Sequence, residues 1–174
     1  DDAPNTTWYN NLISFYDCQF NYNDTLGLHW GGWGGQVLGC EASACPTGIY
    51  IKGGNPVAQA GITTSGGFTI ANNYLEANDD YNIVINNARG TVQNNAMAGS
   101  NSSSSRALAS VYVTGDYSDV YIANNKSWNY YDEMVKIDDA GCTVTGMVPF
   151  TRGSIATDFV TSGYDYREAP LEKE

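Results

Sequence analysis

The stretch FTIANNYLEANDDYNIVINNARGTVQNNAMAG, residues 68–99, decides the fold because it contains one short pattern twice. An apolar residue, a spacer and an asparagine pair occur at 70–73 and again at 92–95, and a third copy follows at 122–125. The copies start 22 and 30 residues apart, and periods of this size are typical of solenoid proteins. Each repeat can bury its apolar face only against its neighbours, so the pattern predicts a stack of repeats.

Weaker copies extend the series in both directions, with apolar anchors at positions 15, 38, 70, 92, 122 and 144. A second strand-like run precedes each anchor from the second repeat onward: Leu28–Trp30, Ile49–Ile51, Ile83–Ile85, Val111–Val113 and Val135–Ile137. The asparagine pair opens a third short segment, such as Tyr74–Glu76. These runs predict an all-β solenoid of about six coils with three strands per coil over residues 1–150. Residues 151–174 have lost the repeat and are predicted to form a cap or a linker.

This pattern resembles the pectate-lyase-like superfamily, which includes pectinases, other polysaccharide lyases and hydrolases, and bacteriophage tailspikes. The resemblance implies a right-handed parallel β-helix with an asparagine ladder in one turn, assigned here to Asp17, Asn72, Asn94 and Asn124. Inward amides that stack at the strand spacing of ~4.8 Å can hydrogen-bond along such a column. Cys40 falls on the same ladder position.

The catalytic motifs of individual families are not reproduced. Lys136-Ile137-Asp138-Asp139 is similar to the Asp-Asp element of polygalacturonases, but the Asn-Thr-Asp, His-Gly and Arg-Ile-Lys elements are absent. The Trp-x-Asp-His stretch of pectate lyases is absent too. The chain is therefore most like a tailspike, a group that shares the coil pattern and has no common catalytic motif.

Composition restricts the partners. Eight basic residues against nineteen acidic ones give a net charge of −11, which makes nucleic acid a poor partner, because phosphate binding needs clustered Lys and Arg. A neutral or lightly charged glycan suits this surface, whereas a strongly anionic one would need Ca²⁺ to bridge it to carboxylates. No other cofactor and no protein metal site is predicted, since a single histidine, His29, cannot build one. The sequence contains no run of 18 apolar residues, so no membrane-spanning helix is predicted.

The four cysteines leave the redox compartment open. Cys40 and Cys45 are close enough in sequence to form a disulfide across a turn, which would suit an extracellular protein. Small buried thiols are the alternative and the interpretation that we favour, because Cys40 and Cys142 fall on inward positions of the repeat.

Strand alternation places one row of outward residues on the first strand of successive coils: His29, Tyr50, Val84, Tyr112 and Lys136. The next row along the strands contains Lys52, Asn86, Thr114 and Asp138. Aromatic rings beside carboxylates are typical of sugar-binding sites, because rings stack on sugars while charged groups orient them. We predict Trp33, Tyr112, Trp128 and Tyr130 as substrate-binding residues. Asp138 and Glu133 are predicted as general acid or base, with Asp116 as the second carboxylate.

The resulting hypothesis is a carbohydrate-active β-helix, extracellular or on a virion surface, that binds and cleaves a polysaccharide such as a bacterial surface glycan. Cleavage could be hydrolytic or by elimination, and the resemblance to tailspikes implies a homotrimer. The alternative is a non-catalytic adhesin or a structural β-helix segment of a longer fibre. Ice binding needs a regular outward threonine array, and the row Thr69, Thr91, Tyr121 and Thr143 is short and interrupted.

Overall fold

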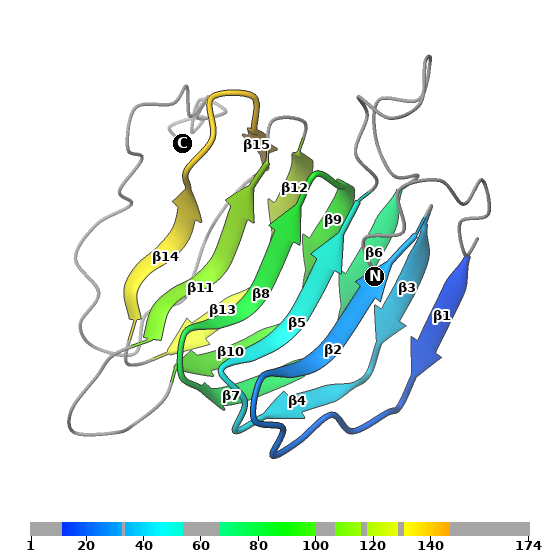
Figure 1. The fold of residues 1–174 in the computed structure, drawn as a ribbon, viewed down its shortest axis with the longest axis vertical. Coiled ribbons are helices and arrows are strands. Elements are labelled where there is room, and N and C mark those ends of the chain that lie inside the picture. Colours follow the sequence, from blue (N-terminus) through cyan, green and yellow to red (C-terminus); the bar gives the residue numbers. More distant parts are fainter. Residues whose placement is uncertain are drawn as a thin grey trace, which may run out of the picture.

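The computed structural model describes residues 12–32, 34–53, 67–99, 107–115, 118–128 and 131–146. Over these residues the chain forms β-strands and no helix, and the strands assemble into three parallel sheets (Figure 1). The all-β class and the parallel strand arrangement predicted from the repeat are thereby confirmed. Residues 147–174, which include the predicted cap or linker, lie outside the described residues.

The three sheets are named A, B and C. Sheet A contains, in spatial order, β1 (Ile13–Tyr16), β3 (Gly35–Leu38), β6 (Phe68–Ala71), β9 (Arg89–Gln93), β12 (Asp119–Ala123) and β15 (Thr143–Thr145). Sheet B contains β13 (Lys126–Trp128), β10 (Ala96–Gly99), β7 (Tyr74–Asn78) and β4 (Glu41–Ser43). Sheet C contains β14 (Tyr131–Ile137), β11 (Ala107–Thr114), β8 (Tyr81–Asn86), β5 (Thr47–Lys52) and β2 (Leu26–Gly31).

The order in which the chain visits the sheets follows the sequence repeat. From β2 onward successive strands belong to sheets C, A, B, C, A, B and so on to β15. Two neighbouring strands of one sheet are therefore separated in sequence by one strand of each other sheet, an arrangement compatible with a parallel β-helix or solenoid (Figure 1). All five runs predicted to precede the anchors lie in sheet C.

Strand register corrects two of the predicted anchors. Val37, not Leu38, pairs with Phe15 and with Ile70. Val37 and Leu38 are both apolar, so the sequence alone could place either of them on the inward position. Val37 is buried and Leu38 is half-buried. Val144 pairs with Val120, so the predicted anchor at 144 was two residues early relative to the anchor at 122.

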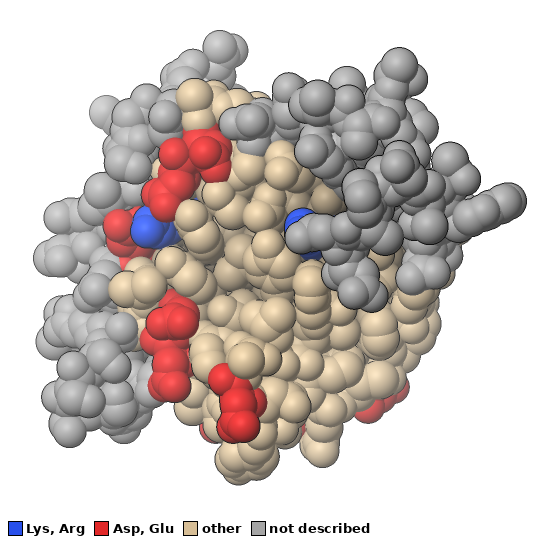
Figure 2. All heavy atoms as spheres, viewed as in Figure 1, with Lys and Arg blue, Asp and Glu red and all other residues tan. Residues whose placement is uncertain are grey.

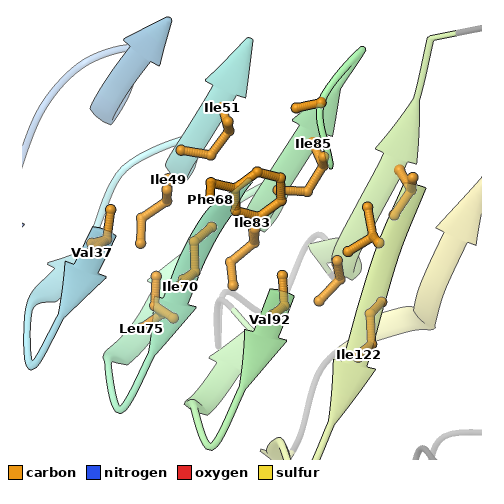
Figure 3. Close-up of a cluster of buried hydrophobic side chains, with 14 of the residues drawn as sticks. Val37, Ile49, Ile51, Phe68, Ile70, Leu75, Ile83, Ile85, Val92 and Ile122 are labelled. Atoms are coloured by element: carbon orange, nitrogen blue, oxygen red, sulfur yellow. The ribbon is translucent and has the colours of Figure 1, made fainter. Parts of the chain in front are cut away.

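The core lies between the sheets and consists of β-branched and aliphatic side chains on inward positions (Figure 3). In sheet A these include Ile70, Val92 and Ile122, and in sheet C Ile83 and Ile85, all at 0% exposure. Each such side chain contributes roughly 1.5–3 kcal/mol through burial. Because equivalent residues of successive strands touch along the stack, the same kind of side chain recurs at the same position.

The turn between sheets A and B explains why an asparagine opens each pair. Asn72, Asn94 and Asn124 are exposed and adopt left-handed backbone conformations, with φ of 58°, 55° and 53°. Asn tolerates this conformation better than other non-glycine residues. Gly39 (φ 65°) and Asp17 (φ 51°) take it at the equivalent turns. The assignment of the inward ladder to Asp17, Asn72, Asn94 and Asn124 was therefore wrong, because these residues form the bend itself.

The second asparagine of each pair points inward and makes the hydrogen bonds. Asn73, Asn95 and Asn125 are 2%, 1% and 2% exposed. The side-chain amide of Asn73 donates to Oδ1 of Asn95 at 2.9 Å, and that of Asn95 donates to Oδ1 of Asn125 at 3.0 Å. The backbone N–H of Cys40 donates to Oδ1 of Asn73 at 2.8 Å. We call Asn73, Asn95 and Asn125 the asparagine column.

Candidate functional site

The outer face of sheet C carries the two predicted rows in register. The first row pairs His29 with Tyr50, Tyr50 with Val84, Val84 with Tyr112 and Tyr112 with Lys136. The second row pairs Lys52 with Asn86 and Asn86 with Thr114, and Asp138 follows directly after β14. Strand alternation thus gave these rows correctly, and the strands of sheet C hold them side by side.

Two tyrosines form a stacked pair on this face. The rings of Tyr81 and Tyr112 lie 4.8 Å apart between centroids with an interplanar angle of 21°. The sequence analysis did not predict Tyr81 as a site residue. Strict alternation places residue 81 on the same side of the strand as the inward residues Ile83 and Ile85. Asn82 is fully buried beside fully buried Ile83, so alternation breaks there and Tyr81 falls on the outer side. The polar Asn82 next to three aliphatic residues was the available signal.

A lysine and an aspartate complete the cluster around Tyr112. The Tyr112 hydroxyl donates to Oδ2 of Asp138 at 2.8 Å. The Lys136 ammonium lies 3.3 Å from the same oxygen and 5.2 Å from the centroid of the Tyr112 ring. Burial, and then the bond to Asp138, raise the pKa of Tyr112 above its ordinary value. We call Tyr81, Tyr112, Lys136 and Asp138 the tyrosine–aspartate cluster.

The pKa values of two other members of the cluster, Tyr81 and Lys136, are raised as well. Burial raises the pKa of Tyr81, partly offset by the charge of Lys136. Burial alone would lower the pKa of Lys136, but the hydrogen bond to Asp138 and the neighbouring phenols more than offset this and raise it. Both phenols are therefore neutral and Lys136 is charged at neutral pH, which leaves hydroxyl donors and one cation beside the rings.

A second aromatic pair lies at the other end of the row. The rings of His29 and Tyr50 meet edge to face with centroids 5.0 Å apart. The Asn86 side-chain amide donates to the Tyr50 hydroxyl at 3.0 Å. Burial and the charge of Lys52 lower the pKa of His29, so its imidazole is neutral at pH 7. Between the two aromatic pairs stands Val84, 4% exposed.

At the edge of this face Asp139 is bound by two donors. Its carboxylate accepts hydrogen bonds from the Thr114 hydroxyl and from the backbone N–H of Gly115. These bonds lower the pKa of Asp139. A carboxylate held in this way is ionised and already satisfied, so it orients the turn rather than transferring protons.

Of the three predicted catalytic carboxylates, the structure describes Glu133 and Asp138. Glu133 lies on β14, pairs with Ala109 and is half-buried, five residues before Asp138, which follows the end of that strand. At ~3.3 Å per residue this separates the two backbones by roughly 16 Å, well beyond the ~6.5 to 9.5 Å of an inverting pair. The geometry therefore brings Asp138 together with Tyr112 and does not make Glu133 its partner. Asp116 lies outside the described residues.

The predicted substrate-binding residues are described unevenly. Tyr112 is half-buried on the outer face of sheet C. Trp128 ends β13 of sheet B, where its backbone pairs with Ala98, and its side chain lies outside the described part. Trp33 and Tyr130 also lie outside the described residues. Of the four, Tyr112 is the one whose contacts contribute to the candidate site.

Figure 2 shows this face with its charges. Acidic residues gather mainly along one side of the view, around one basic group, and a broad area without charged groups lies beside them. Among the described residues no group of three or more His, Cys, Asp or Glu side chains is arranged to hold a metal ion. No helix in the described part of the chain is long and apolar enough to cross a membrane.

Comparison of the chain with protein-family models, with curated proteins and with solved structures finds no match. What the site does must therefore be argued from its own chemistry.

Proposed function

We propose that the chain is a right-handed parallel β-helix of about six coils, similar to the pectate-lyase-like superfamily and most like a tailspike, and that it binds a polysaccharide. Successive strands belong to sheets C, A and B in turn, and this repeated order supports the proposed architecture. The binding surface in this proposal is the outer face of sheet C, from His29 to Lys136. Its location is extracellular or on a virion surface, and its ligand is a bacterial surface glycan.

The observation that carries the proposal is the tyrosine–aspartate cluster. The half-buried rings of Tyr81 and Tyr112 stack on each other, and together they present an aromatic surface against which a sugar ring can pack. Lys136 and Asp138 stand beside them as a donor and an acceptor for sugar hydroxyls. Equal numbers of opposite charges at this point favour a neutral or lightly charged glycan over a polyanion.

Binding is better supported than cleavage. Asp138 already accepts a hydrogen bond from Tyr112 and pairs with Lys136, so its carboxyl group is held by two neighbours, which suits a binding group. Glycoside hydrolysis needs a second carboxyl within ~10 Å that can act as an acid. Cleavage stays a second candidate on one specific observation, namely that an exposed Asp138 stands against a tyrosine hydroxyl and a lysine.

Two measurements test glycan binding by the outer face of sheet C separately from glycan cleavage. Titration calorimetry of neutral bacterial surface polysaccharides should detect binding to the parent, and Tyr112→Ala should weaken it by about 1–2 kcal/mol, or roughly five- to thirtyfold. Tyr121→Ala is the matched control, because Tyr121 is 44% exposed on the outer face of sheet A. Equal losses in both variants, or none in Tyr112→Ala, would place the ligand elsewhere.

Cleavage is measured in the same samples as new reducing ends or as unsaturated products. Under binding alone, the parent and Asp138→Asn both leave the polysaccharide intact. Turnover by the parent that Asp138→Asn abolishes, with affinity retained within about threefold, would establish the second candidate instead. Light scattering at micromolar concentration tests the proposed homotrimer independently.

A further inference from the structure

Cys18 and Cys40 occupy the same position in two neighbouring turns. On one side of them Tyr16 pairs with Leu38, and on the other side Gln19 forms a bridge with Glu41. Backbone hydrogen bonds bracket the two cysteines, since Asp17 N–H donates to the Leu38 carbonyl at 3.2 Å and Glu41 N–H donates to the Cys18 carbonyl at 2.8 Å. The register therefore sets Cys18 directly beside Cys40, in line with the asparagine column.

The two thiols have matching orientations. Cys18 Sγ donates to the carbonyl of Tyr16 at 3.3 Å, and Cys40 Sγ donates to the corresponding carbonyl of Leu38 at 3.5 Å. Cys40 Sγ also reaches across to the Phe15 carbonyl of β1 at 3.6 Å. Burial raises the pKa of Cys40. The matching bonds place the two thiols on the same side of neighbouring turns.

The other two cysteines are not placed in this way. The backbone N–H of Cys45 donates to the side-chain oxygen of Asn78, which is the last residue of β7. The neighbour of Cys45 is therefore an asparagine and not a cysteine. Cys142 precedes Thr143, whose N–H donates to the Ser118 carbonyl. All four cysteines are free, so the bridge between Cys40 and Cys45, which the sequence left open and which we did not favour, is not formed. Only Cys18 and Cys40 face each other across one strand spacing.

We propose that Cys18 and Cys40 form a disulfide when the protein meets a small disulfide oxidant such as oxidised glutathione. Neighbouring strands lie ~4.8 Å apart, within the ~4.4 to 6.8 Å that a disulfide requires between Cα atoms. The thiolate of Cys18, the more exposed residue, attacks the oxidant and releases one glutathione. The Cys40 thiolate then attacks Cys18 Sγ and releases the second glutathione, so two thiol protons and two electrons pass to the oxidant.

The bridge would secure one edge of sheet A. Strand β1 is the last strand of that sheet and pairs only with β3 within the described residues. A covalent link from Cys18 to Cys40 closes a ring containing β2 and β3, and therefore also holds His29 at the end of the outer face of sheet C. Disulfides persist in oxidising compartments, so this bridge suits the proposed extracellular location without depending on glycan binding.

The experiment counts thiols in the whole chain after equilibration in glutathione buffers of increasing oxidised fraction. The parent should fall from four titratable thiols to two, lose two hydrogens in mass and yield a peptide joining Cys18 to Cys40. Its melting temperature should rise by several degrees and return on reduction. Cys45→Ser and Cys142→Ser should each fall from three thiols to one.

Cys18→Ser, at the more exposed position, should keep all three thiols and show no change in melting temperature on oxidation. Cys40→Ser should behave in the same way, and agreement between the two variants excludes a folding defect as the cause. The proposal is overturned if the parent keeps four thiols, carries only glutathione adducts, or yields a bridge that involves Cys45 or Cys142.

Discussion

Two sets of equivalent positions repeat along this molecule, and they differ in how uniform they are. The asparagine column repeats one residue, at Asn73, Asn95 and Asn125. The outer row of sheet C changes at every strand, from His29 through Tyr50, Val84 and Tyr112 to Lys136. Inside the stack each residue must satisfy the one before it and the one after it. In the outer row His29, Tyr50, Tyr112 and Lys136 keep contact with water, and Val84, although buried, needs no hydrogen-bond partner. No member of the row therefore has to match its neighbours.

This difference separates what specifies the fold from what specifies the ligand. A buried amide with no partner costs about 1–3 kcal/mol for each group left unsatisfied, so a column of amides works only when its members match. Exposed neighbours across a parallel pair contribute at most about 1 kcal/mol. Changes to the column should therefore affect stability, and changes to the outer row should affect binding.

The largest effect is expected from Asn95→Leu. The Asn95 amide donates to the Ile70 carbonyl and to Asn125, and its oxygen accepts from the backbone and side chain of Asn73. Leucine breaks all four bonds inside the core, so the free energy of unfolding should fall by at least about 4 kcal/mol. Urea denaturation measures the change.

Asn94→Leu is the matched control for this prediction, one residue earlier and exposed. Leucine tolerates the left-handed backbone conformation at this position (φ 55°) less well than asparagine does. The substitution should therefore lower the free energy of unfolding by only about 1 kcal/mol. Equal destabilisation by the two substitutions would mean that the column does not hold the stack together.

A somewhat smaller loss is expected from Ile85→Ala. Ile85 is fully buried in the core cluster, and removing three carbon atoms leaves a cavity that costs about 3 kcal/mol. Leu108→Ala, at 41% exposure on neighbouring β11, should cost less than about 1 kcal/mol. Denaturant midpoints of the two variants should separate clearly, and coincident midpoints would contradict the assignment of inward positions.

How far the sequence predicted these two regions follows from the same contrast. Period-two alternation placed the outer row of sheet C correctly, because Ile83–Ile85, Val111–Val113 and Val135–Ile137 are short runs with apolar residues at both ends. The class of fold followed from the repeat. The asparagine pair was the exception, since two identical residues give no sign of which one turns inward.

The equivalent turn at Gly39 and Cys40 contained the missing information. Glycine favours the left-handed conformation and cysteine is commonly buried, so this pair marks its first residue as the bend. Tyr81 was missed because Asn82 breaks the alternation that the prediction relied on. The contacts among Tyr112, Lys136 and Asp138 depend on side-chain conformation, which no sequence spacing specifies.

A modest effect is expected from Tyr112→Phe, which keeps the ring and removes the hydroxyl bonded to Asp138. Because this bond is exposed, stability should fall by only about 0.5 kcal/mol. If stacking on the ring provides the affinity, glycan binding should stay within about threefold of the parent, while Tyr112→Ala loses it. A loss as large as that of the alanine variant would assign recognition to the hydroxyl pair instead.

The smallest effect concerns Asp139, at the edge of the outer face, and it appears only in acid. Bonds from Thr114 and Gly115 lower the pKa of this carboxyl below its ordinary value of 3.8. The folded state therefore takes up the proton less readily than the unfolded chain. The stabilisation by Asp139 is complete above the unfolded pKa and is lost as pH falls through the folded one.

Unfolding free energies of the parent and Asp139→Asn should differ by a constant amount above about pH 5 and converge below about pH 4. Thr114→Val removes one donor and should show a shallower acid dependence than the parent, since the Gly115 bond remains. Parallel curves for the parent and Asp139→Asn down to pH 2 would show that these bonds do not favour the ionised carboxylate.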